Sequence, residues 1–161
     1  MIQKEFTALP RFGYALSQYD PIISVRSSGR ELNVSPKAAR EVCQAVKGMR
    51  VSAARAFLEK VINLKIAVAF RRYNKKVGHK SSLNGFHAGR YPRKTAMKVL
   101  EVMDNLEANA EFKGLDLDRL FISHAASHRG MKMKRYVPRA FGRSSPSFRT
   151  LVHIELAARE K

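Results

Sequence analysis

Lysine, arginine and aromatic side chains are mixed through residues 70–91, a stretch that also contains glycine but no carboxylate. Cationic groups neutralise phosphates and aromatic rings stack on unpaired bases, so this mixture is typical of a surface for single-stranded or looped nucleic acid. The stretch is too rich in glycine and too aperiodic for a helix, and it is long for a plain connection. The alternative interpretation is a flexible, solvated loop whose rings pack onto the core.

A second basic stretch runs from Arg119 to Glu155, with no acidic residue between these two. Its ends are apolar and its centre contains glycine and proline, which predicts a long β-hairpin over about residues 119–158. With about 16 residues in each arm, the ribbon would extend about 55 Å. A free two-stranded ribbon is marginally stable and the like charges repel each other, so we expect RNA or DNA to order it.

These two stretches, with Arg93 and Lys94 just after the first, supply the side chains that we predict, from charge and aromatic character, to contact RNA. All are cationic except one tyrosine that follows two arginines. They are Arg71, Arg72, Tyr73, Lys75, Lys76, Lys80, Arg90, Arg93, Lys94, Arg129, Lys132 and Arg149.

Other residue patterns could in principle support catalysis or metal binding, but none does so convincingly. His124 and His128 form an HxxxH pair, yet in a strand they would lie about 13 Å apart, too far for one metal ion. Cys43 falls in an apolar helical stripe and is expected to be buried. The chain has no phosphate-binding glycine loop, nucleophile elbow or CxxC motif. We therefore predict no catalytic residue, no metal site and no cofactor.

The composition favours a partner of negative charge. The 161 residues include 31 lysines and arginines against 13 acidic residues, which gives a formal net charge of +18. Self-repulsion of this size opposes compaction unless a counter-charged partner offsets it. The longest apolar run, residues 66–70, is too short to cross a bilayer, so we expect no membrane insertion. The absence of an apolar signal sequence and the single Cys43 predict an intracellular protein.

The elements that would position the basic stretches follow from apolar periodicity and from helix-boundary residues. A strand is predicted within residues 22–34, with a kink or bulge at Gly29. The pair Ser35-Pro36 is a typical helix start, and Gly48 is a typical stop.

A second helix is predicted from Ser52 and a third, the longest, over residues 92–113, followed by Gly114. We expect the acidic residues of the third helix to form a solvated face turned away from the polyanion: Glu101, Asp104, Glu107 and Glu111. Residues 1–21 show no period and are predicted to form an N-terminal arm, and residues 22–161 to form a single RNA-binding domain.

Residues 133–143 resemble the hairpin tip of large-subunit ribosomal protein twenty-two, called seventeen in eukaryotes. The most specific matches are the Lys-Arg pair at 134–135 and the RAxGR motif at 139–143. Shorter matches are residues 35–40, 47–49, 105–110 and 114–116. The resemblance covers about residues 22–156, and residues 70–74 with their glycine-rich sequel resemble the archaeal and eukaryotic branch.

This resemblance implies an α+β fold with three helices packed on a three-stranded antiparallel sheet and a long protruding hairpin. It implies a structural, non-enzymatic constituent of the cytoplasmic large ribosomal subunit, with large-subunit rRNA, neighbouring ribosomal proteins and the nascent polypeptide as partners. The globular part would lie near the polypeptide exit and the tip would line the exit tunnel. The implied stem and tip contacts are Lys134, Arg135, Arg139 and Arg143. The implied tip consists of Tyr136, Val137, Pro138, Arg139, Ala140, Phe141, Gly142 and Arg143.

Two other classes of protein remain open from the residues alone. Architectural DNA-binding proteins also extend basic β-ribbons, and Val137 with Pro138 could act as the apolar wedge that kinks a duplex. An enzyme that acts on RNA would need a convergent acid, base or metal cluster, which the sequence does not assemble.

Overall fold

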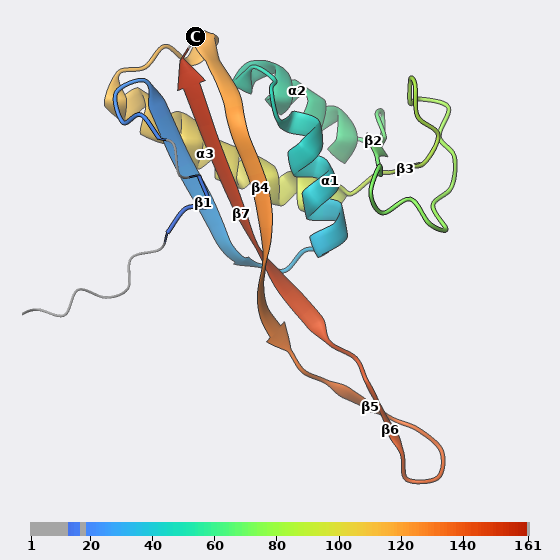
Figure 1. Cartoon of the computed structure of the whole chain (residues 1–161). Coiled ribbons are helices and arrows are strands. Elements are labelled where there is room, and N and C mark those ends of the chain that lie inside the picture. The colour runs from blue at the N-terminus through green and yellow to red at the C-terminus, as the bar shows by residue number, and fades with distance from the viewer. Residues whose placement is uncertain (1–12, 17–18, 161) are drawn as a thin grey trace, which may run out of the picture.

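Three helices cover one face of a three-stranded antiparallel sheet, and a long ribbon extends from the sheet beyond the helices (Figure 1). This computed structural model describes residues 13–16 and 19–160. Most of the predicted N-terminal arm, residues 1–12 and 17–18, therefore lies outside the described residues. The predicted fold class, α+β with three helices on a three-stranded antiparallel sheet and a protruding hairpin, is confirmed.

The helices begin and end close to the predicted residues. Helix α1 (Pro36–Val46) follows Ser35, and α2 (Val51–Ile62) begins one residue before the predicted start. Helix α3 (Arg93–Lys113) is followed by Gly114, which adopts the left-handed conformation that favours glycine, with a φ of 72°. Helices α1 and α3 pack on the sheet, while α2 packs mainly against α3.

The sheet has the order β1-β7-β4, in which β7 (Arg149–Glu160) pairs with both β1 (Ser24–Leu32) and β4 (Leu120–Met133). Val152 and Ile154 of the middle strand follow the period of two that defines one sheet face, and both are fully buried in the core. The middle strand therefore adds these two side chains to the core, while the helices contact the sheet mainly through its outer strands, α3 through β1 and α1 through β4.

The bulge predicted at Gly29 is confirmed, because the β1–β7 register shifts between Gly29 and Leu32. A Cβ atom at position 29 would lie only 2.6 Å from Cγ2 of Val102 in α3. Glycine thus allows the helix to approach the backbone of the sheet at the point where β1 bends.

The ribbon continues β4 and β7 past the helices and contains a second, shorter strand pair near its tip. Strands β5 (Tyr136–Pro138) and β6 (Ser144–Pro146) pair with each other rather than with the main sheet. The turn closes through the N–H of Arg139, which donates to the carbonyl of Arg143 at 2.8 Å. The ribbon is therefore paired in two sections, with an interruption before β5.

Three short elements complete the described chain: β2 (Val68–Ala69), β3 (Gly89–Arg90) and the 3₁₀ helix η1 (Leu117–Arg119). Over the described part of the chain, no helix is long and apolar enough to cross a membrane.

Candidate nucleic-acid interface

The basic loop of residues 70–91 is closed at its base by the β2–β3 pair, which aligns Val68 with Arg90. Further out, the N–H of Phe70 donates to Ala88 at 3.0 Å and the N–H of Lys80 donates to His87 at 2.9 Å. Phe70 and Ala88 are buried. The loop is therefore joined to the core at its base and is partly paired with itself.

A buried carboxylate fixes the start of this loop. Glu41 of α1 is only 1% exposed, and its oxygens accept the consecutive backbone N–H groups of Arg71, Arg72 and Tyr73 at 3.1 to 3.3 Å. Successive N–H groups of this kind form a concave anion site. Because the carboxylate holds the backbone, the side chains of the two arginines remain exposed to solvent.

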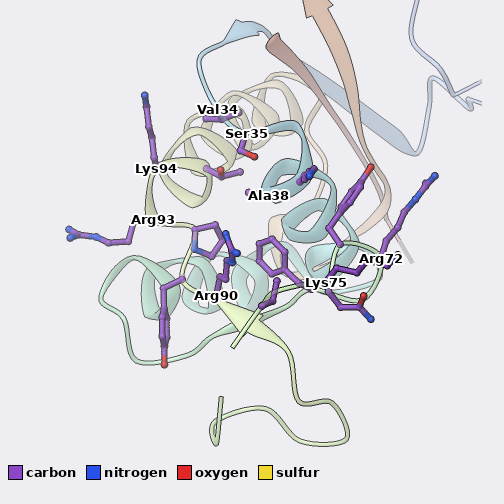
Figure 2. Close-up of a pocket in the computed structure, with 16 residues that line it drawn as sticks. Val34, Ser35, Ala38, Arg72, Lys75, Arg90, Arg93 and Lys94 are labelled. Atoms are coloured by element: carbon purple, nitrogen blue, oxygen red, sulfur yellow. The ribbon is translucent and has the colours of Figure 1, made fainter. Parts of the chain in front are cut away.

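A cavity brings several predicted RNA-binding residues together between the start of α1, the loop and the start of α3 (Figure 2). Six of the predicted residues line it: Arg72, Tyr73, Lys75, Arg90, Arg93 and Lys94. Lys37 also lines it, although sequence reasoning did not select this residue. The cavity joins residues that lie about sixty positions apart in the sequence, so no local pattern indicated it.

Apart from Phe70, which is buried in the core, the aromatic rings of the loop lie beside cations. Arg72 and Lys37 lie 5.8 and 5.7 Å from the ring centre of Tyr73, and Arg71 lies 5.4 Å from that of Phe86. The rings of Tyr73 and Phe86 are half-buried, and Tyr73 also packs against the hydrophobic core. The loop therefore contacts the core, as the alternative interpretation expects, and keeps cations at its surface; its role in binding nucleic acid stays a prediction.

The predicted cations of the ribbon are all exposed: Arg129, Lys132, Lys134, Arg135, Arg139, Arg143 and Arg149. None of them forms an ion pair with an acidic residue of the described chain. Within the tip, Tyr136 contacts Phe148 edge to face with ring centres 5.8 Å apart, and Phe141 is 97% exposed. The ribbon thus presents unneutralised positive charge along its length.

A sequence model of the family described as Ribosomal protein L22p/L17e matches residues 27–159. This chain belongs to that family. The match spans the sheet, all three helices, the basic loop and the ribbon, so it covers both predicted interfaces. The resemblance inferred from the tip motif is confirmed.

Several archaeal members of the family are similar over nearly their whole length. The large ribosomal subunit protein uL22 of Nitrosopumilus maritimus is 53% identical over 150 residues, which cover 93% of this chain and 98% of the relative. The protein of the same name from Cenarchaeum symbiosum is 52% identical over 92% of this chain and 97% of its own length. That from Archaeoglobus fulgidus is 45% identical over 93% and 97%.

In this family member, the acidic face of α3 does more than meet solvent. Asp104 and Glu107 both form ion pairs with Arg55 of α2. These hydrogen bonds, first that of Glu107 and then that of Asp104, raise the pKa of the Arg55 guanidinium. The prediction of a wholly solvated acidic face was therefore incomplete, because two of its members join α2 to α3.

The two histidines of the HxxxH pair lie in β4, as predicted. Burial lowers the pKa of His124, and its Nε2 atom has no hydrogen-bond partner among the described residues. His128 lies 3.7 Å from the buried carboxylate of Glu155. No group of three or more potential ligands for a metal ion occurs in the described ranges.

Proposed function

We propose that this chain is a structural constituent of the cytoplasmic large ribosomal subunit and that it binds large-subunit rRNA. Family membership and the printed names of the relatives support the ribosomal assignment and a structural, non-enzymatic role. The rRNA-binding role rests on the charges of the chain itself.

The observation that carries the RNA-binding proposal is the uncompensated charge of the ribbon. Its lysines and arginines between residues 129 and 149 are exposed and lack acidic partners among the described residues. Residues 134–148, the outer part of the ribbon, include no buried side chain that would hold it against its own domain. A polyanion that neutralises these cations releases counterions and stabilises the ribbon.

The finer part of the proposal places the globular domain near the polypeptide exit and the tip, residues 136–143, along the exit tunnel. The length and narrowness of the ribbon suit insertion between rRNA strands (Figure 1). In this arrangement the tip would also meet the nascent polypeptide, and the outer faces of the domain would meet neighbouring ribosomal proteins.

Binding to RNA is tested by the salt dependence of the affinity of the full chain for large-subunit rRNA fragments. Each phosphate contact contributes about 0.7 to 0.9 to the log–log slope, so the proposal requires a steep slope of several units. Co-sedimentation with large subunits at low salt checks the assembly. A shallow slope together with failure to co-sediment would contradict the proposal.

A bent DNA duplex provides the comparison that separates this function from an architectural DNA-binding role. The exposed pair Val137 and Pro138 at the tip is the feature that favours the DNA alternative. Tighter binding to the duplex than to the folded rRNA fragments at equal salt would support it.

A further inference from the structure

The cavity between α1, the basic loop and α3 has a volume of about 710 Å³. Sites that enclose small organic ligands typically have volumes of about 300 to 1,000 Å³. A flat protein surface is sufficient to contact the phosphates of a duplex, because these lie on the outside of the helix. A cavity of this size has room for a single ligand of that kind.

The floor of the cavity is apolar and aromatic. Val34 and Phe70 are buried at its base, and Ala38, Tyr73 and Val77 line it while half-buried. Apolar side chains and a ring suit the faces of a nucleobase, which stack on aromatic surfaces. The backbone of Tyr73 is held by its N–H, which donates to buried Glu41, and its side chain packs against the hydrophobic core.

The rim of the cavity is cationic. Six of the sixteen residues that line it are lysines or arginines, and none is acidic: Lys37, Arg72, Lys75, Arg90, Arg93 and Lys94. Figure 2 shows Arg93 and Lys94 extending outward on one side and Arg72 on another. The first turns of α1 and α3 also face the cavity, and within the described chain neither has an acidic residue or a side-chain cap. The positive ends of the two helix dipoles add to the positive potential, although Pro36 has no N–H and the N–H of Arg93 donates to the carbonyl of Tyr91.

We propose that this cavity binds a single extruded nucleotide of the rRNA, with its base on the floor and its phosphates at the rim. The inference rests on the proposed rRNA-binding function and adds a specific site to it. An unpaired base that leaves its stack presents an apolar face and remains attached to two phosphates, which matches the floor and the rim together. An acidic peptide would satisfy the cations but would leave the aromatic floor without a matching surface.

The test uses the full chain and transcribed large-subunit rRNA from Nitrosopumilus maritimus, the source of the relative that is 53% identical. The substitution Ala38→Phe fills the cavity without altering the charge, because Ala38 lines its floor. The matched control is Ala53→Phe, which places the same side chain on the exposed face of α2. Each complex is probed with dimethyl sulfate and a carbodiimide, which modify unpaired bases, and with hydroxyl radicals, which cleave the backbone.

We expect the wild type and Ala53→Phe to protect one unpaired base or a small group of them. With Ala38→Phe the same base should be modified at least about five times faster than with the wild type, the low end of the loss expected for a base–aromatic stack. The backbone protections at other sites should not change. A base-protection pattern that is identical in all three proteins would overturn the inference and leave the rRNA-binding proposal intact. A wild type that protects neither bases nor backbone would instead overturn the underlying function.

A second pair of variants keeps the test decisive if Ala38→Phe fails to fold, which circular dichroism would reveal. Tyr73→Ala removes the ring from the floor, while Tyr73→Phe retains it. The inference requires Tyr73→Ala to lose protection of the base and Tyr73→Phe to keep it, at equal helical content. Equal protection by both variants would show that no base stacks there. If, in assembled subunits, the cavity cross-links to a neighbouring ribosomal protein and not to RNA, the inference is overturned and an acidic peptide is the favoured occupant.

Discussion

The basic loop of residues 70–91 and the outer ribbon of residues 134–148, which includes the tip, have similar compositions but different support. The loop is held by buried Glu41, by paired strands at its base and by buried Phe70. The outer ribbon has only its own short β5–β6 pair and one contact between Tyr136 and Phe148. Charge alone therefore does not determine whether a binding segment is ordered before its partner arrives. The loop has the contacts to be ordered in the free protein, whereas we predict that the outer ribbon becomes ordered only when RNA binds.

The largest expected difference is in amide exchange of the free protein. Amides of α3 such as that of Leu106 should exchange only through global unfolding, so at a typical stability of about 5 kcal/mol they would be slowed by more than about three orders of magnitude. Those of residues 139–143 should exchange nearly as fast as in an unfolded chain. Exchange is measured by mass spectrometry or NMR. If, without RNA, the amides of residues 139–143 exchange as slowly as those of α3, the expected difference in order does not exist.

The support of the loop by its buried carboxylate predicts a large loss of stability for Glu41→Ala. Three backbone N–H groups would lose a charged acceptor, which should lower the free energy of unfolding by about 3 kcal/mol. Glu41→Gln should cost less because its amide oxygen still accepts. Denaturant titration measures the loss, and the exposed Glu101→Ala in α3 is the control, with an expected change within about 0.5 kcal/mol. Equal losses at positions 41 and 101 would show that the loop does not depend on this carboxylate.

The electrostatic role of the loop is tested by replacing Arg71, Arg72, Lys75 and Lys76 together by alanine. If all four contact phosphates, the log–log slope of affinity against salt should fall by about three units. The fold should persist because Glu41 binds the backbone of the loop and not these side chains. A double variant of Lys98 and Arg119, which pair with acids, serves as the control. An unchanged slope in the quadruple variant would show that these four cations do not contact phosphates.

The smallest effect on stability is expected from deletion of residues 134–143. None of these side chains is buried, so the free energy of unfolding should change by less than about 0.5 kcal/mol. If the tip lines the tunnel, subunits that carry the deletion should assemble but respond differently to stalling peptides. Failure to accumulate mature large subunits in cells that express only this form would indicate an assembly role for the tip instead.

Local patterns in the sequence predicted most of the fold. Ser35-Pro36 indicated the start of α1, Gly114 the end of α3, and Gly29 the bulge in β1, because each acts on its immediate neighbours. The alternation of apolar residues on either side of a basic centre similarly indicated the ribbon. Such signals lie within a few residues of the structure that they determine.

The missing parts of the prediction all depend on residues that are distant in the sequence. Glu41 could not be distinguished from a solvated helix carboxylate, since its partners are N–H groups thirty positions further on. The pairing of Arg55 with Asp104 and Glu107 is a contact between two helices. The cavity requires the first turns of α1 and α3 to lie side by side, which only the packed core determines.

The position of β7 between β1 and β4 has a consequence for synthesis of the chain. The middle strand is translated after both of its neighbours. One edge of β1 and one edge of β4 therefore have no strand partner until residues 149–160 have left the ribosome. Unpaired edges readily pair with other chains, and the intervening basic segment attracts any available nucleic acid. During synthesis, each copy of the chain is thus exposed for a time both to pairing of its strand edges with other chains and to binding of nucleic acid. Early capture by a chaperone, before the last strand emerges, would shorten that interval.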